Sequence, residues 1–67
     1  MGSDKDDFKT LLNYFVAHSK EHAGEFLEMA NKAKTIGKND IYKALIDGVE
    51  KMNKATEAFE SALEMLV

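Results

Sequence analysis

One short run of turn-forming residues divides this chain: residues 36–41 read IGKNDI. Glycine adopts the left-handed backbone conformation at the end of a helix at little cost, so Gly37 is expected to end a helix at Ile36. Asn39 or Asp40 is then expected to cap the next helix, because their side-chain oxygens accept hydrogen bonds from its free backbone N–H groups. The chain is therefore predicted to be two long helices joined by one turn.

No proline interrupts the sequence on either side of this turn, and hydrophobic residues recur there with helical spacing. Residues 1–4 are interpreted as a flexible N-terminus or a tag remnant, and residues 5–67 as one helical hairpin. Its predicted parts are a helix over 5–36, a turn over 37–40 and a helix over 40–66. The predicted fold class is therefore all-α, an antiparallel helical hairpin.

Hydrophobic positions on both predicted helices alternate between spacings of four and three residues, a heptad pattern that keeps one seam of a helix against its partner. Folded antiparallel at the turn, positions whose numbers sum to 77 or 78 face each other. Met29 then meets Gly48, a large side chain against a small one, and Ser19 meets Phe59. The predicted core and dimer-interface residues are Phe8, Leu12, Phe15, Ser19, His22, Phe26, Met29, Leu45, Gly48, Met52, Ala55, Phe59, Leu63 and Leu66.

The hydrophobic stripe on each predicted helix is wider than this seam. Val16, Ala23 and Leu27 flank it on the first helix, and Val49 and Thr56 flank it on the second. Because each stripe spans about 100 degrees or more, one partner helix cannot cover it. We therefore predict that two hairpins pair into an antiparallel four-helix bundle, a homodimer with two-fold symmetry. The alternative is docking onto a helical face of another protein partner.

Composition excludes several classes of function. All nine basic residues are lysine, twelve residues are acidic and the net charge is -3, which argues against a nucleic-acid partner. The absence of cysteine excludes disulfides, thiolate metal sites and thiol nucleophiles. No run approaches the ~18 apolar residues of a membrane span, and the acidic N-terminus lacks a signal-peptide core, so a cytoplasmic protein with no membrane partner is expected.

Two histidines form the most unusual polar feature. His18 and His22 are four residues apart, so both rings project from one helix face and can reach one divalent transition metal. Glu21 and Glu25 follow them by three residues and are candidate oxygen ligands or acceptors for the ring N–H groups. His22 is also predicted to be buried in the seam, where a polar residue fixes register and oligomer state without any metal. The sequence favours this structural role, with no cofactor, and keeps the metal as the alternative.

Known catalytic patterns are missing from the sequence, which has neither a glycine-rich phosphate loop nor a nucleophile elbow. A non-enzymatic, self-associating interaction or scaffold module is therefore the leading hypothesis. One alternative is a small metal- or cofactor-binding four-helix bundle that uses His18 and His22. The other is a small helical subunit that completes a larger assembly.

A resemblance adds to this interpretation. Residues 14–26 contain the pattern Tyr14-Phe15-x-x-His18-Ser19-x-x-His22-Ala23-x-x-Phe26. It resembles short uncharacterised prokaryotic helical-hairpin domains with a His-Asn-x-x-His-Ala-like segment. Ser19 stands where that family usually has asparagine, and Phe15 where tryptophan is expected. The resemblance implies a helical hairpin and points to His18 and His22, but it implies no activity.

Overall fold

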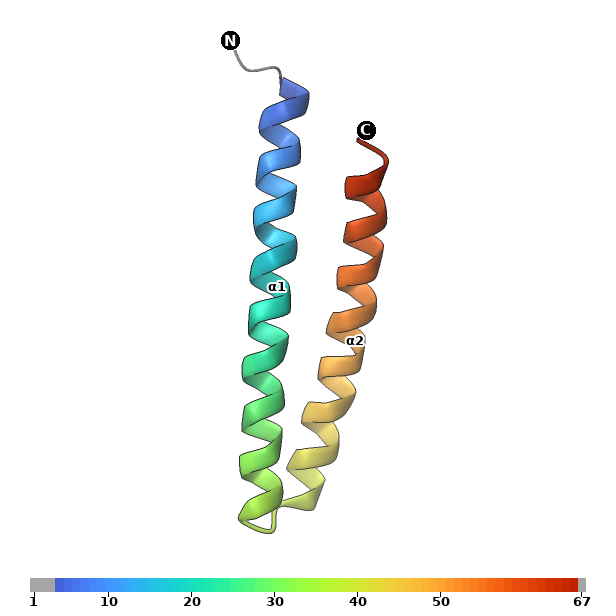
Figure 1. The fold of residues 1–67 in the computed structure, drawn as a ribbon. Helices are drawn as coiled ribbons and strands as arrows, with labels where there is room; N and C mark the ends of the chain where they lie inside the picture. Colours follow the sequence, from blue (N-terminus) through green and yellow to red (C-terminus); the bar gives the residue numbers. More distant parts are fainter. Residues whose placement is uncertain (1–3, 67) are drawn as a thin grey trace.

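The computed structural model describes residues 4–66 and folds them into two long antiparallel helices joined by one turn (Figure 1). Helix α1 is Asp4–Thr35 and helix α2 is Asn39–Glu64. The start of α1 and the end of α2 lie at the same end of the molecule (Figure 1). The prediction of an all-α helical hairpin is therefore confirmed, with α1 one residue earlier at both ends and α2 ending two residues earlier than expected.

Charged residues at the ends of α1 suit its helix dipole. Asp4, Asp6 and Asp7 lie in its first turn, and Lys32 and Lys34 lie in its last turn. Negative charge near the N-terminus and positive charge near the C-terminus stabilise a helix by about 0.3–1 kcal/mol each. Asp4, predicted to belong to the N-terminal tail, is thus part of α1, whereas residues 1–3 lie outside the described residues.

The turn is a hydrogen-bonded helix end built on Gly37, whose φ is +80°. The N–H of Lys38 donates to the carbonyl of Ala33 at 2.8 Å, and the N–H of Gly37 donates to that of Lys34 at 3.1 Å. These two bonds define the Schellman motif, which requires a left-handed residue at the position of the glycine. The predicted helix stop at Gly37 is confirmed.

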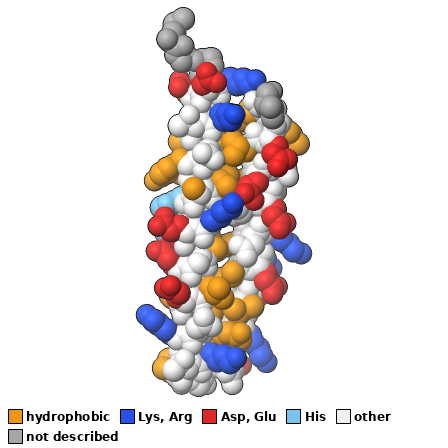
Figure 2. All heavy atoms as spheres, viewed as in Figure 1, with side chains coloured by type: hydrophobic (Ala, Val, Ile, Leu, Met, Phe, Trp, Pro, Cys, Tyr) orange, Lys and Arg blue, Asp and Glu red, His pale blue; other side chains and the backbone are white. Residues whose placement is uncertain are grey.

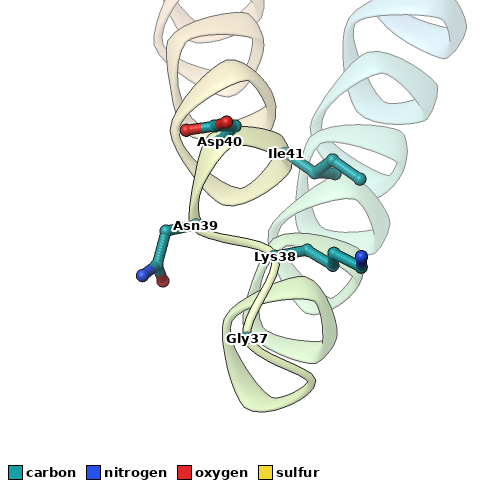
Figure 3. A pocket seen from close by; sticks show the side chains of 5 residues that line it. All are labelled: Gly37, Lys38, Asn39, Asp40 and Ile41. Atoms are coloured by element: carbon teal, nitrogen blue, oxygen red, sulfur yellow. The ribbon is translucent and has the colours of Figure 1, made fainter.

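Helix α2 begins without the side-chain cap that the sequence led us to expect. Its N-cap position is Lys38, which makes no capping hydrogen bond through its side chain. The carbonyl of Lys38 already accepts a bond from the N–H of Tyr42 at 3.0 Å, so Asn39 is inside the helix. In Figure 3 the side chain of Asn39 points away from both helices. The predicted cap at Asn39 or Asp40 is therefore wrong.

The seam between the helices is rotated by one residue from the predicted one. The most buried residues are Val16, Ala23, Ala30 and Ala33 on α1, and Val49 and Thr56 on α2. Half-buried positions agree with the prediction at Leu12, Ser19, Leu45, Met52, Leu63 and Leu66. The other predicted seam positions are exposed, namely Phe8, Phe15, His22, Phe26, Met29, Gly48, Ala55 and Phe59. Small side chains such as Ala23 and Ala30 let the helices approach closely, which leaves the larger neighbouring side chains beside the seam.

The register of the hairpin also differs from the predicted one. The Ser19 and Thr56 hydroxyls form a hydrogen bond at 2.9 Å between the helices, so Ser19 faces Thr56 rather than Phe59. Thr56 is only 3% exposed. A buried hydroxyl is costly unless it is hydrogen-bonded, and this bond satisfies both partners. Among residues 4–66, no buried side-chain nitrogen or oxygen lacks a hydrogen-bond partner.

The two helices lie side by side in a single layer. Its extents are 55 × 18 × 11 Å and its radius of gyration is 15.8 Å, against about 11 Å for a compact chain of this length. Among residues 4–66, no large side chain is fully buried. The hairpin therefore has a seam but not an enclosed core. Neither helix, over the same residues, has a stretch long and apolar enough to cross a membrane.

Candidate interaction face and histidine pair

One side of the seam is a hydrophobic surface that we call the open face. Its residues recur every seven positions, and between the ends of the hairpin each lies one residue before a seam position. They are Phe8, Phe15, His22, Met29 and Ile36 along α1 and into the turn, and Ile41, Gly48, Ala55 and Ala62 on α2. In an antiparallel helix pair, positions offset in this way project to the same side on both helices. Hydrophobic side chains of the two helices are therefore brought together in one continuous surface.

Two shallow hollows mark where the helices meet on the open face. Met29 and Ile36 line one of them together with Ile41 of α2. Phe26 lines the other together with Ala44 and Gly48 of α2. The large side chains on this face are half exposed, at 55% for Phe15 and 51% for Met29. The hairpin alone thus leaves these side chains in water.

Side-chain size differs sharply between the two helices on the open face. The α1 column consists of two phenylalanines, a histidine, a methionine and an isoleucine, whereas Gly48, Ala55 and Ala62 form most of the α2 column. A Cβ atom placed at Gly48 would meet nothing within 4 Å. The open face is therefore a ridge along α1 beside a low strip around Gly48 and Ala55 on α2, bordered farther along α2 by Phe59, which is 50% exposed.

The opposite side of the seam, which we call the polar face, carries contacts that join the two helices. Its positions are Asn13, Lys20, Leu27 and Lys34 on α1, and Ile46, Asn53 and Glu60 on α2. The Lys20 Nζ atom lies 2.6 Å from Glu60 Oε2. The Lys34 Nζ atom lies 5.1 Å from the centre of the Tyr42 ring, in cation–π range. Polar side chains thus bridge the helices on this face.

The view in Figure 2 shows acidic and basic side chains on both helices, with hydrophobic side chains in the space between them. The histidine atoms lie at the edge of α1 that faces away from α2 (Figure 2). The predicted burial of His22 in the seam is wrong, because its side chain is 48% exposed. The polar residues in the seam are instead Ser19 and Thr56, whose hydroxyls form a hydrogen bond between the helices.

The two histidines form a connected pair on the surface of α1. The Nε2 atoms of His18 and His22 are 2.9 Å apart, within hydrogen-bond distance. His22 Nδ1 lies 2.6 Å from Glu25 Oε1, and His18 Nδ1 lies 3.8 Å from Glu21 Oε2. Both side chains remain nearly half exposed, at 45% for His18 and 48% for His22. The four residues selected from the sequence therefore form a chain of contacts in the order Glu21, His18, His22 and Glu25.

An aromatic ring supports one end of this pair. The Tyr14 ring stacks on His18 with centroids 5.7 Å apart and an interplanar angle of 12°. The His18 and His22 rings are nearly perpendicular, at 83°, with centroids 4.3 Å apart. This stacking was not predicted, although Tyr14 precedes His18 by four residues, the spacing that places side chains on one helix face. Within residues 4–66, no group of three or more His, Asp or Glu side chains is placed to hold a metal ion.

A further hollow lies at the turn and is lined by residues 37–41 (Figure 3). The charged side chains that line it, Lys38 and Asp40, are of opposite sign. The side chain of Asn39 points away from the helices in this view (Figure 3). This hollow contains none of the site residues predicted from the sequence.

The fold and these surfaces define a class of protein: a two-helix, all-α hairpin with one hydrophobic face and a histidine pair at its edge. Residues 8–66 match the family described as Domain of unknown function (DUF8180). The match spans most of the chain, so the chain belongs to this family. Comparisons with curated proteins and with solved structures gave no significant match.

Proposed function

We propose that this chain is a non-enzymatic, self-associating helical module whose working form is a homodimeric four-helix bundle. The open face is the observation that carries the proposal. It joins a ridge of large side chains to a strip of small ones, so that one surface contains both halves of a complementary fit. A surface of this kind suits a symmetric interface, in which each copy uses the same patch.

The exposed area supports a second copy as the partner. The chain exposes 5331 Å², whereas a monomer of its mass typically exposes about 4,200 Å². The excess of roughly 1,100 Å² exceeds the approximately 800 Å² per partner that a stable interface usually buries. The surplus is therefore large enough for an interface of ordinary size.

The shape of the open face favours one arrangement of the two copies. A two-fold axis parallel to the helices places the α1 ridge of each copy over the α2 strip of the other. Because Ser19 lies level with Thr56, Met29 lies level with residue 46, within one helical turn of Gly48. In this arrangement Met29 of one copy fits over Gly48 of the second, and all four helices are antiparallel to their neighbours.

A two-fold axis perpendicular to the helices gives a poorer fit. It sets ridge against ridge and strip against strip, so Phe15 and Met29 of the two copies compete for the same space. The strips around Gly48 and Ala55 are then held apart, which leaves a gap. Interiors pack densely with few voids, so the parallel axis is the favoured geometry.

Sedimentation equilibrium of the untagged chain at micromolar concentration tests the proposal. The expected mass is twice the 7.5 kDa of one chain, together with a fully helical circular dichroism spectrum. A mass of one chain with full helicity would overturn it. A single-chain mass with weak or non-cooperative helicity would also overturn it, and would favour the alternative of a subunit that completes a larger assembly. The cytoplasmic location stays a prediction.

A further inference from the structure

We infer that His18 and His22 form a binding site for one divalent transition-metal ion per chain, with their Nε2 atoms as two adjacent ligands. The site lies at the outer edge of α1 and shares His22 with the open face, but both ligands come from one chain, so the site does not require the self-association proposed above. The sequence allowed a metal at these residues only as an alternative to burial of His22. The structure removes the burial and brings the two ring nitrogens together.

The separation of the two nitrogens matches one coordination geometry. Imidazole nitrogens bind such metals at about 2.0–2.1 Å, so ligands at right angles lie about 2.9 Å apart, whereas tetrahedral ligands lie about 3.3 Å apart. His18 Nε2 and His22 Nε2 are 2.9 Å apart. The pair is therefore arranged for neighbouring positions of an octahedral or square-planar ion. Binding requires the proton that His18 Nε2 shares with His22 to move to His18 Nδ1, which lies 3.8 Å from Glu21 Oε2.

Glu25 prepares His22 for this role. Its carboxylate lies 2.6 Å from His22 Nδ1, so Nδ1–H donates to Glu25 and the lone pair of neutral His22 is on Nε2. A carboxylate in this position fixes the tautomer and orientation of a metal-binding imidazole and raises its basicity. Glu25 is thus a positioning residue, as its spacing in the sequence suggested.

The ring of His18 has two aromatic neighbours. Tyr14 stacks on it, and the His22 ring meets it nearly at right angles. Fewer accessible orientations mean that less conformational freedom is lost when the ion binds. Both histidines are nearly half exposed, so an ion reaches them without any opening of the hairpin.

The ligand chemistry selects the ion. Neutral imidazoles suit nickel, copper and zinc, whereas calcium and magnesium require oxygen ligands. Right-angle geometry favours Ni²⁺ and Cu²⁺ over tetrahedral Zn²⁺. Since the described residues offer no third ligand placed with this pair, water completes the coordination. The ion links two successive turns of α1 and so stabilises that helix against unfolding.

Calorimetric titration of the full chain with NiCl₂ tests the site. The expected result is one Ni²⁺ per chain, a raised thermal midpoint and shifted imidazole resonances of both histidines. His18→Ala should abolish all three effects. The matched control is the double variant A17H/H18A, which keeps two histidines but moves one to a different face of α1, where Ala17 is exposed. It should bind no better than His18→Ala.

Glu25→Gln tests the positioning role. It should keep the stoichiometry but weaken Ni²⁺ binding about tenfold, and the imidazole nitrogen shifts of His22 should show loss of the single tautomer. Circular dichroism of each variant confirms that the hairpin is folded. Equal Ni²⁺ binding by the native chain and A17H/H18A would overturn the inference, as would one ion per two chains. A monomeric Met29→Lys variant should still bind one Ni²⁺, which separates this site from dimer formation.

Discussion

The two sides of the hairpin seam differ in how they are completed. On the polar face, the Lys20–Glu60 ion pair and the contact of Lys34 with the Tyr42 ring join α1 to α2. On the open face, Phe15 and Met29 are half exposed beside a strip of glycine and alanine. The contacts on the polar face are therefore made within one chain, whereas the open face leaves large hydrophobic side chains exposed, as interaction surfaces do.

The largest expected effect comes from a charge placed on the open face. Met29→Lys should weaken self-association by more than about a hundredfold, because an unpaired ammonium group is costly to bury. Leu27→Lys is the matched control, since Leu27 has a similar exposure of 42% but lies on the polar face. Sedimentation equilibrium should show dissociation of the first variant alone. Equal effects of the two variants would remove the distinction between the faces.

The seam between the two faces is expected to respond to loss of its buried hydrogen bond. Ser19→Ala leaves the Thr56 hydroxyl buried without its partner, which should cost about 1–3 kcal/mol of the free energy of unfolding. The double variant S19A/T56V removes both hydroxyls and should recover most of that loss. Urea denaturation measures both. If the double variant is no more stable than the single one, the hydrogen bond does not define the seam.

Glycine replacement tests whether the strip on α2 is covered. Gly24→Ala and Gly48→Ala each add a Cβ that meets nothing within 4 Å in the hairpin, so both should gain about 1 kcal/mol from helix propensity alone. In the proposed dimer Met29 of the second copy lies over Gly48, so Gly48→Ala should gain less than Gly24→Ala. Thermal melts compare the two, and the difference should vanish in a Met29→Lys background. An equal gain in both backgrounds would mean that nothing covers Gly48.

The smallest effect is expected from the polar face. Lys20→Ala removes an ion pair whose side chains are 57% and 39% exposed, and exposed pairs contribute only about 0.2–1 kcal/mol. The unfolding free energy should fall by less than about 1 kcal/mol, with no change of mass in sedimentation equilibrium. Dissociation of the dimer by this variant would show that the polar face takes part in association.

Local features of the fold were predictable from the sequence, but the choice of seam was not. The end of α1 depends on one left-handed residue, and Gly37 identifies it. The seam depends on packing in three dimensions: the columns through Phe15 and through Val16 are both hydrophobic with the same spacing, so periodicity alone does not rank them. The small side chains at Ala23 and Ala30 were the available signal, because they allow the closest approach of the helices.

For the histidine pair, too, contacts within α1 were predictable from the sequence, whereas burial against α2 was not. Spacing predicted that His18 and His22 share a face of α1 and that Glu25 reaches His22, and these contacts are present. Burial of His22 was wrong, because burial depends on which of two adjacent columns faces α2. Helical periodicity thus fixes contacts within one helix, while contacts between helices depend on side-chain volume.

Disulfide cross-linking tests most directly whether a second copy completes the open face, because the chain has no cysteine of its own. Met29→Cys and Gly48→Cys chains are mixed, oxidised and analysed by mass spectrometry. A mixed disulfide dimer is expected, since the proposed dimer places these two positions opposite each other and a disulfide requires close Cα atoms. Little cross-linking is expected from Met29→Cys alone or from a mixture of Leu27→Cys with Gly48→Cys. Absence of the mixed dimer, or equal cross-linking in the Leu27→Cys mixture, would show that the open face does not pair in this way.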